Sequence, residues 1–258
     1  MKLTTAKIIS NKEVMSGIFL TWLEAPDIAP EAKSGQFVMV KCGTNNEMLL
    51  RRPLSIHQKD GERIAILFRV TGKGTDWLSE RVTDETLNII GPLGNGFDIS
   101  SRSQNLLLIA GGMGIAPLVF LAQEAVSRNY NVTLLCGAAS KNELYPKNML
   151  PSQVRYIPAT DDGLVGRQGF VTDLLPAYID RTDQVFACGP VPMYRTLIEK
   201  KKELLKGKPA QLSLELRMAC GHGVCYGCTV NTARGLKQVC KDGPVFDLED
   251  ILIEEVVC

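Results

Sequence analysis

The pattern of hydrophobic and polar positions divides the chain into three parts. In the first part, short apolar runs rich in β-branched and aromatic residues recur between turn-forming Gly, Pro, Asn and Asp, as at Gln36–Val40, Ile64–Val70 and Thr86–Ile90. Runs of this kind are typical of β-strands, and many short strands joined by tight turns favour a small barrel. We therefore expect an antiparallel β-barrel over residues 1–101.

The second part alternates between two patterns. Continuous apolar runs at Leu106–Ala110, Val132–Cys136 and Gln184–Cys188 are expected for strands that are buried on both faces. Helices are expected at Ala116–Arg128 and Val191–Lys206, between and after these runs. Strands that alternate with helices predict a Rossmann-like, parallel α/β sheet over residues 102–206.

The third part is rich in Cys and Gly and has only short apolar runs. It follows Lys208–Pro209, which we interpret as a linker. Such a segment has too little apolar material to fold well alone, and a metal centre would stabilise it. We expect residues 207–258 to form a small third domain, so that the predicted fold class is multidomain, β plus α/β.

Composition and charge exclude some classes of protein. The hydrophobic fraction of 45% and the charged fraction of 22% are those of an ordinary globular protein. A net charge of +1 gives no reason to expect a nucleic-acid partner. Apolar runs stay well below the roughly 20 residues that a spanning helix needs, and the N-terminal residues do not resemble a signal peptide. We expect a cytoplasmic protein that binds neither membrane nor nucleic acid.

The strongest chemical signal is a group of cysteines. Four of the eight cysteines fall close together, at Cys220, Cys225, Cys228 and Cys240. Their C-x4-C-x2-C…C spacing is the plant-type [2Fe–2S] ligand pattern, and the glycines between them let a loop wrap closely around a cluster. A structural zinc site is the alternative, but zinc sites usually use C-x2-C pairs. The spacing therefore predicts an iron–sulfur cluster, with His222 as a bystander.

Two glycine motifs follow predicted strands of the second part. Gly111, Gly112 and Gly114 form a turn directly after Leu106–Ala110, and such a turn into a helix N-terminus is a phosphate cradle. The motif Cys188-Gly189-Pro190 ends a later strand. Ligands of open α/β sheets bind at the carboxyl ends of strands, so both motifs fall on the expected binding edge. The alternatives are a tight turn for packing and a buried cysteine before a helix.

Three weaker motifs lie in the barrel region. Arg51–Ile56 (RRPLSI) offers guanidinium groups that match phosphate oxygens and a hydroxyl that can bind a flavin edge. Phe68–Thr71 (FRVT) and Gly72–Thr75 (GKGT) follow, with Gly74 and Thr75 as possible pyrophosphate donors. Taken singly, each is more easily explained as an ordinary strand end or turn. The same holds for Gly91–Phe97 (GPLGNGF), which we interpret as a tight turn rather than a cofactor loop.

Taken together and in this order, the motifs resemble a known family over essentially the whole chain. The barrel with R-x-x-S, the GG-x-G-I-A-P turn and the late C-G-P resemble the ferredoxin-NADP reductase superfamily. The stretch Leu214–Cys228, Cys240 and the following Asp242–Phe246 resemble the electron-transfer subunit of type B (NAD-dependent) dihydroorotate dehydrogenase. The motifs RRPLSI, GKGT and GPLGNGF resemble the same family.

The resemblance implies roles for the matching positions. FAD would be lined by Arg52, Pro53, Leu54, Ser55, Arg69, Val70, Thr71, Gly74 and Thr75, with Arg52 toward the pyrophosphate and Ser55 near the flavin N5 edge. Gly111, Gly112 and Gly114 would face the phosphates of NAD(H), and Cys188, Gly189 and Pro190 would lie near the nicotinamide. The superfamily often has Tyr where Leu54 stands, so here an aliphatic residue must pack on the flavin.

The resemblance also implies the activity. Electrons would run between NAD(H) and FAD as a hydride, and between FAD and the [2Fe–2S] cluster singly. No general acid or base is needed, and we assign no catalytic residue. The implied partner is an FMN-containing subunit that oxidises dihydroorotate to orotate in pyrimidine biosynthesis, in a hetero-oligomer with two copies of each chain.

Two other functions stay open on the sequence. One is an FAD and [2Fe–2S] reductase subunit of a ferredoxin transhydrogenase or a hydrogenase complex. The other is a non-catalytic module with structural zinc. The choice between NADH and NADPH is also open: Ser140 and Lys141 follow the second α/β strand, where a 2′-phosphate would be bound, but Glu143 is close by and favours NADH.

Overall fold

The barrel predicted at the N-terminus is present and closed. The computed structural model describes residues 1–43 and 48–252. The strands of the barrel follow the spatial order β1-β2-β5-β4-β3-β6. They are β1 (Lys2–Met15), β2 (Ile18–Glu24), β3 (Phe37–Val40), β4 (Arg52–Asp60), β5 (Arg63–Arg69) and β6 (Thr86–Leu93). All ladders between them are antiparallel, as the turn-rich pattern predicts.

An α-helix interrupts the region that the apolar pattern assigns to strands. Helix α1 (Lys73–Ser79) follows the motif GKGT. Its start is fixed locally, because the hydroxyl of Thr75 accepts the backbone N–H of Gly72 at 3.2 Å. Its end is capped by Asn11, whose side-chain amide donates to the carbonyl of Leu78 at 3.1 Å. A helix this short leaves no periodic pattern in the sequence.

The second part forms the predicted parallel sheet. The strand order is β10-β9-β8-β7-β11-β12-β15, and the ladders from β10 to β12 are parallel. The strands of this part are β7 (Asn105–Gly111), β8 (Asn131–Ala138), β9 (Arg155–Thr160), β10 (Arg167–Gln168) and β11 (Gln184–Cys188). Its helices are α2 (Ile115–Ser127), α3 (Val191–Glu199) and α4 (Lys201–Leu204).

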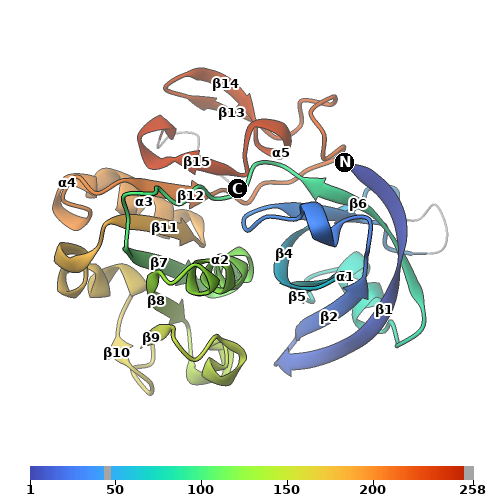
Figure 1. Cartoon of the computed structure of the whole chain (residues 1–258), viewed down its shortest axis with the longest axis horizontal. Coiled ribbons are helices and arrows are strands. Elements are labelled where there is room, and N and C mark those ends of the chain that lie inside the picture. The colour runs from blue at the N-terminus through green and yellow to red at the C-terminus, as the bar shows by residue number, and fades with distance from the viewer. Residues whose placement is uncertain (44–47, 253–258) are drawn as a thin grey trace.

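Helix α2 lies between the parallel sheet and the barrel (Figure 1). Its residues from Ile115 to Ala122 are buried all round. One apolar cluster accordingly combines α2 and strands β7 and β8 with Leu20, Ala65 and Leu67 of the barrel. A helix that is apolar all round is buried on all sides, so α2 is the packing element that fixes barrel and sheet together.

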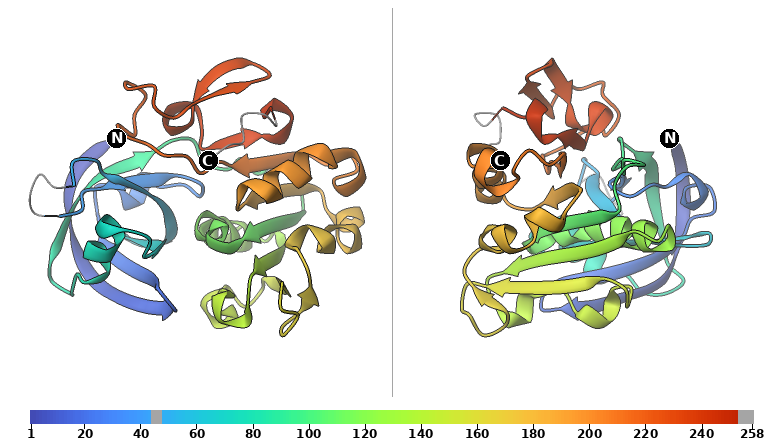
Figure 2. Two further views of the ribbon diagram at one scale, coloured as in Figure 1. Left: turned by 180° about the vertical axis from the view of Figure 1, so that it is seen from behind. Right: turned by 60° about the vertical axis from the view of Figure 1, so that its left-hand side comes forward.

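The third part is joined to the parallel sheet. Strand β12 (Ala210–Ser213) pairs with β11, and β15 (Val245–Asp247) pairs antiparallel with β12. Between them lie the hairpin β13 (Thr229–Thr232) and β14 (Gly235–Gln238) and helix α5 (Val239–Asp242). Figure 2 shows this C-terminal segment above both barrel and sheet. The domain division at residue 206 therefore stays a prediction, because strands on its C-terminal side extend the sheet.

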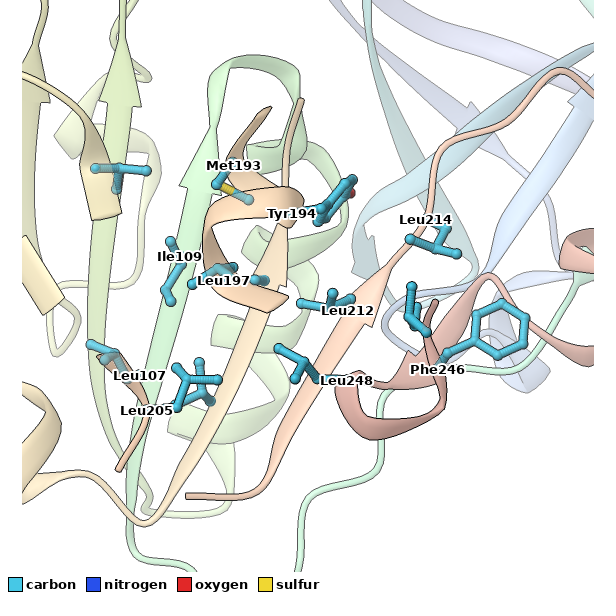
Figure 3. Packing of buried hydrophobic residues seen from close by; sticks show 14 of the residues in the cluster. Leu107, Ile109, Met193, Tyr194, Leu197, Leu205, Leu212, Leu214, Phe246 and Leu248 are labelled. Atoms are coloured by element: carbon cyan, nitrogen blue, oxygen red, sulfur yellow. The ribbon is translucent and has the colours of Figure 1, made fainter. Parts of the chain in front are cut away.

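The shared core explains this arrangement. Leu212, Leu214, Phe246 and Leu248 from the third part belong to the same apolar cluster as residues of β7, α3 and α4 (Figure 3). A cysteine-rich segment has few apolar residues of its own, so it buries them against the sheet edge and gains a core there. The linker predicted at Lys208–Pro209 leads directly into β12.

The long helix predicted at Val191–Lys206 is divided in two. Helix α3 ends at Glu199, and α4 begins at Lys201. The backbone N–H of Lys200 bonds to the carbonyls of Thr196 and Ile198, which tightens the last turn of α3. Within the described ranges, none of the helices has the length and apolar character needed to cross a membrane.

Candidate functional site

The first cavity, of about 300 Å³, lies where all three parts of the chain meet. The barrel contributes the ends of β4 and β5 and the turn before α1, and the sheet contributes the loop into α2. The third part contributes the stretch from Ser213 to Met218. The lining residues are Phe37, Arg52, Pro53, Leu54, Ser55, Leu67, Phe68, Arg69, Thr71, Thr75, Met113, Ala116, Ser213, Leu214, Glu215, Leu216, Met218 and Pro244.

Seven of the nine residues predicted to bind FAD line this cavity. The other two are Val70, which packs against the core of the barrel, and Gly74. Gly74 lies outside the lining but contacts it, because a Cβ placed there would lie 2.6 Å from Nε of Arg52. The guanidinium of Arg52 thus packs directly on the turn that opens α1. A guanidinium beside backbone N–H groups is a suitable cradle for a pyrophosphate.

The remaining lining of the first cavity is mainly apolar. Phe37 and Leu67 from the barrel face the cavity, as do Leu216 and Met218 from the third part. Leu54 also lines it, where the superfamily often has an aromatic ring. Large apolar surfaces with a few placed polar groups suit a flat ring system carrying phosphates. The residues present therefore fit a flavin dinucleotide.

The second cavity, of about 340 Å³, lies at the carboxyl ends of the parallel strands. Its lining residues are Gly111, Gly112, Gly137, Ala138, Ala139, Glu143, Asp161, Gly169, Phe170, Val171, Thr172, Pro190, Pro192, Met193 and Thr196. Three of the six residues predicted to bind the nicotinamide cofactor are among them, namely Gly111, Gly112 and Pro190. This is the edge at which open α/β sheets bind their ligands.

The other three predicted residues form the wall behind this cavity. The loop after β7 and the loop after β11 touch each other through their backbones. A Cβ at Gly114 would lie 1.9 Å from the carbonyl oxygen of Cys188 and 2.6 Å from the backbone nitrogen of Gly189. A Cβ at Gly111 would lie 2.6 Å from the ring of Pro190. Glycines are thus required here for the close approach of two chain segments.

The charges around the second cavity are acidic. Glu143 and Asp161 line it, and none of the described residues in its lining is basic. Glu143 is held by Arg69, whose guanidinium donates to its carboxylate at 2.9 Å. Because Arg69 lines the first cavity, this ion pair connects the rims of the two sites. An acidic pocket repels a 2′-phosphate and accepts ribose hydroxyls, which favours NADH over NADPH.

A polar cluster lies beside the two cavities, with Cys188 and Tyr194 buried and Glu215 exposed in the lining of the first cavity. The thiol of Cys188 donates to the carboxyl group of Glu215 at 3.6 Å, and the hydroxyl of Tyr194 donates to the carbonyl of Ser213 at 2.5 Å. Burial raises the pKa of the Cys188 thiol and that of the Tyr194 hydroxyl. The buried thiol of Cys188 and phenol of Tyr194 are thus neutral hydrogen-bond donors, whereas the carboxyl group of Glu215 opens onto the first cavity.

The four predicted metal ligands lie in pairs around the cluster loop. Against the effect of burial, the side chain of Cys225 lowers the pKa of the Cys220 thiol, whereas burial and the side chain of Cys228 raise the pKa of the Cys240 thiol. Among residues 1–43 and 48–252, no three Cys, His, Asp or Glu side chains converge as ligands of a single metal ion would. The C-x4-C-x2-C…C spacing of these thiols favours a [2Fe–2S] cluster over one tetrahedral zinc.

The surroundings of these thiols differ. Burial alone would raise the pKa of Cys220, but backbone N–H groups of the loop lower it to about 6. The backbone N–H groups of Gly227 and Cys240 point at the sulfurs of Cys225 and Cys228, at 3.5 and 3.4 Å. Backbone donors around thiolates are what an iron–sulfur site requires. Cys228 and Cys240 are buried, whereas Cys225 is exposed.

The motif GPLGNGF ties the barrel to the cluster segment. The backbone N–H of Asn95 donates to the carbonyl of Gly243 at 2.6 Å, and its side-chain amide donates to the carbonyl of Asp242 at 2.9 Å. Gly94 has a φ of +73°, and a Cβ there would lie 2.6 Å from the Gly243 oxygen. This loop is thus a joint between two parts of the chain, beside the first cavity that Pro244 lines.

Sequence reasoning missed several lining residues. Glu215 and Met218 stand in the stretch before the cysteines, where the motif drew attention to the thiols alone. Phe170 lines the second cavity from the loop before Val171, and Thr196 lines it from helix α3; neither belongs to a recognisable motif. Glu143, which the sequence already indicated, follows β8 at the binding edge of the sheet, and Asp161 follows β9 at the same edge.

Two protein-family models match parts of the chain. The "Iron-sulfur cluster binding domain of dihydroorotate dehydrogenase B" matches residues 215–252. The "Oxidoreductase NAD-binding domain" matches residues 108–198.

Two curated relatives match nearly the whole chain. Both are named "Dihydroorotate dehydrogenase B (NAD(+)), electron transfer subunit". The protein of Desulforamulus reducens is 38% identical over 254 residues, which cover 95% of this chain and 96% of the relative. The protein of Listeria welshimeri is 35% identical over 256 residues, which cover 96% of this chain and 98% of the relative.

Solved structures show the same fold. An NADH-dependent reduced ferredoxin-NADP oxidoreductase, described for flavin-based electron bifurcation, superposes with a TM-score of 0.87 and 29% identity. The match covers 97% of this chain and 91% of that one. A ferredoxin NADP+ reductase from Neisseria gonorrhoeae, with bound FAD and NADP, gives a TM-score of 0.66 at 17% identity, over 79% of this chain and 92% of that chain. The second likeness shows the fold alone.

Proposed function

The chain belongs to the family of dihydroorotate dehydrogenase B electron transfer subunits, and from this premise we propose how its residues transfer electrons between NAD(H) and a catalytic partner subunit. It is an oxidoreductase subunit with FAD, a [2Fe–2S] cluster and NAD(H) as cofactors. When bound, the flavin supplies hydride exchange with the nicotinamide and single-electron exchange with the cluster. The chain's own residues supply position, polarity and exclusion of water.

One observation carries the proposal: a single cavity is lined by all three parts of the chain. Arg52 and Thr75 in its lining would hold the pyrophosphate of FAD, and Ser55 would offer its hydroxyl to the flavin. Met113 and Ala116 bring the nicotinamide loop to the same space. The segment from Ser213 to Met218 lines the cavity and reaches the first cluster ligand two residues later. This arrangement is what successive transfer between three groups requires.

Two loops of the chain indicate how the nicotinamide dinucleotide would lie between the two cavities. The glycine loop at Gly111–Gly114 and the end of β11 at Cys188–Pro190 lie between the two cavities. We propose that the dinucleotide phosphates lie against the glycine loop, and that the nicotinamide passes Cys188 toward the first cavity. The buried hydrogen-bonded pair of Cys188 and Tyr194 would then lie behind the nicotinamide, and Glu215 would face the first cavity.

The proposal is tested by the visible spectrum of the protein purified without oxygen. We expect flavin absorption together with a broad iron–sulfur shoulder, and both should bleach when NADH is added. A Cys228→Ser variant should lose the iron–sulfur shoulder and keep flavin bleaching, because Cys228 lies outside the lining of the first cavity. A colourless protein that carries zinc would refute the proposal.

We further propose that the partner is an FMN-containing subunit that oxidises dihydroorotate to orotate, assembled with two copies of each chain. Val224 and Tyr226 flank the exposed ligand Cys225, and their exposed fractions are 66% and 70%. Exposed apolar side chains beside a cluster suit a docking face for an electron partner. Copurification of an FMN protein with dihydroorotate activity, lost in a Tyr226→Asp variant, would support this partner.

A second candidate function rests on the solved structure with 29% identity, which is a ferredoxin-NADP oxidoreductase. In that case the partner would be a larger iron–sulfur subunit and not an FMN dehydrogenase. The acidic lining of the second cavity disfavours NADPH at this site. The protein that copurifies with the chain separates the two candidates.

For the location we propose the cytoplasm. The seven described cysteines are all free thiols. Free thiols and iron–sulfur clusters persist where the compartment is reducing. Fractionation of cells with an antibody against the chain tests this proposal.

A further inference from the structure

The inference concerns His57, a fully buried histidine that the transfer of electrons does not use. It lies on β4, two residues after Ser55, and its exposed fraction is 0%. Its Nδ1 lies 2.8 Å from the carbonyl oxygen of Ala116, and its Nε2 lies 2.9 Å from the hydroxyl of Tyr145. Both partners belong to the nicotinamide-binding part, so one imidazole ring joins the flavin strand to the other domain.

The backbone at His57 is shaped to make this contact. The ladder between β4 and β5 slips by one residue there, because Ile56 pairs with Ile66 whereas Gln58 pairs with Ala65. A β-bulge of this kind redirects a side chain and often lies next to a functional site. Ile56 belongs to the interior of the barrel, and the ring of His57 reaches the start of α2.

The protonation state follows from the two partners. A carbonyl oxygen only accepts hydrogen bonds, so Nδ1 of His57 carries the proton and donates to Ala116. Nε2 is then free to accept the hydroxyl proton of Tyr145. Burial lowers the pKa of His57 to about 4, which keeps this neutral form at physiological pH. The hydroxyl of Tyr156 donates to the carbonyl of Tyr145 at 3.0 Å and holds that segment in turn.

Ala116 connects His57 to the flavin cavity. It belongs to the first turn of α2, directly after the glycine loop, and it lines the flavin cavity together with Met113. We propose that His57 is a positioning residue that fixes the nicotinamide loop over the flavin cavity through its hydrogen bond to Ala116. The inference rests on the proposed function, because it assigns His57 a role in the transfer between nicotinamide and flavin.

The rest of the joint supports this assignment. The contact between α2 and the barrel is otherwise largely apolar, through Leu20, Ala65 and Leu67, and apolar packing has no preferred direction. A second polar contact crosses it at the far end of α2, where the hydroxyl of Ser34 donates to Glu124 at 2.5 Å. His57 is the directional contact at the end of α2 that carries the glycine loop.

Two variants separate the two hydrogen bonds of the ring. In His57→Asn the side-chain amide can replace Nδ1 and donate to Ala116, but it does not reach Tyr145. In His57→Gln the amide reaches toward Tyr145 and leaves the carbonyl of Ala116 without this donor. A Tyr145→Phe variant removes the Tyr145 partner and leaves His57 in place. Thr21→Val, which breaks a buried bond to Asn11 inside the barrel, is the control for general destabilisation.

The measurement is the rate at which saturating NADH reduces the flavin, together with the NADH concentration for half-maximal rate. We expect His57→Asn and Tyr145→Phe to stay within about threefold of the wild-type limiting rate. We expect His57→Gln to lose about tenfold or more, because a displacement near 1 Å can cost a hundredfold. The flavin difference spectrum on adding NAD+, which involves no turnover, should change in His57→Gln alone.

Three outcomes decide the matter. Loss of limiting rate in His57→Gln, with thermal unfolding no worse than in His57→Asn, supports the inference. Equal rates in both variants, or a loss that follows the unfolding temperature as in Thr21→Val, would overturn it and leave the proposed function intact. Failure of NADH to reduce the wild-type protein would refute the proposed function itself.

Discussion

The contact between Gly114 and Cys188 allows a prediction with a clear geometric basis. Gly114 has a φ of −59°, a value that any residue adopts, so its backbone conformation does not require glycine. Space alone requires it: a Cβ would lie 1.9 Å from the carbonyl oxygen of Cys188 and 2.2 Å from its carbon. We therefore expect Gly114→Ala to force apart the two loops that form the wall of the nicotinamide site.

The size of the effect follows from these distances. Real Cβ atoms are essentially never found within 3.0 Å of such neighbours, so the loops must separate by roughly 1 Å or more. Cys188 pairs with Ala110 in the ladder between β11 and β7, so this separation strains the sheet as well. Overpacking of this kind costs about 1–3 kcal/mol of stability. A 1 Å error at a reacting pair costs about a hundredfold in rate.

The assay is anaerobic stopped-flow reduction of the flavin by NADH, with thermal unfolding measured on the same samples. Gly61→Ala is the matched control, because Gly61 has a φ of +55° and no atoms near its missing Cβ. That variant strains the backbone by about 1–2 kcal/mol, far from either cavity. We expect both variants to unfold earlier than the wild type, and Gly114→Ala alone to lose about a hundredfold in NADH-dependent reduction.

Two results would refute this reasoning. If Gly114→Ala is reduced by NADH as fast as the wild type, the loops are not required at their observed separation. If Gly61→Ala loses the same activity, the effect is one of stability and not of position. We expect all samples to contain equal amounts of flavin, because Gly114 lies outside the lining of the first cavity.

Three further predictions follow from the two cavities and the joint between them. Gly74→Ala should weaken FAD retention about tenfold, because its Cβ would lie 2.6 Å from Nε of Arg52. The increase in flavin fluorescence on dilution measures the release of FAD. Gly72→Ala is the control and should retain FAD, because a Cβ at Gly72 has no atom within 4 Å. The double variant Glu143→Gln, Asp161→Asn should raise the NADPH to NADH ratio of kcat/KM about tenfold, since two nearby like charges are removed. Folding lowers the pKa of His57 from 6.5 to about 4. Between these pH values the folded protein binds fewer protons than the unfolded chain, so the free energy of unfolding falls as the pH drops through this range. From pH 7 to pH 4 we expect a loss of about 3 kcal/mol from this group, absent in His57→Asn, by urea unfolding at each pH.

Local patterns in the sequence were sufficient for the barrel and the parallel strands. The strand at Gln184–Cys188 is observed with the predicted bounds, and the helix expected at Ala116–Arg128 begins and ends one residue earlier, at Ile115 and Ser127. These elements are buried on both faces or all round, so their apolar runs are uninterrupted and easy to read. Helix α1 could not be predicted in this way, because its seven residues are held by Thr75 and Asn11 and are too few to show periodicity.

The sites could be predicted in part, for a different reason. Motifs identify residues that act through backbone shape or fixed spacing, such as Gly111, Gly114 and the cluster cysteines. They do not identify residues that reach a site from elsewhere in the fold. Glu215 and His57 are of this second kind, since Glu215 follows a strand that pairs with distant strands, and His57 contacts Ala116 and Tyr145, which are 59 and 88 residues away. Contacts between domains are therefore where the structure adds most to the sequence.

The path between flavin and cluster is fixed by the way the third part joins the sheet. Strand β12 is paired on both sides, with β11 and with β15, so its end at Ser213 is held rigidly beside the nicotinamide loop. The chain then lines the flavin cavity through Met218 and reaches Cys220 two residues later, at most about 7 Å further on. Covalent continuity thus keeps a cluster ligand near the flavin cavity whatever the partner does. A free-standing cluster domain on a flexible linker would lack this constraint, and the extension of the sheet by β12 and β15 supplies it.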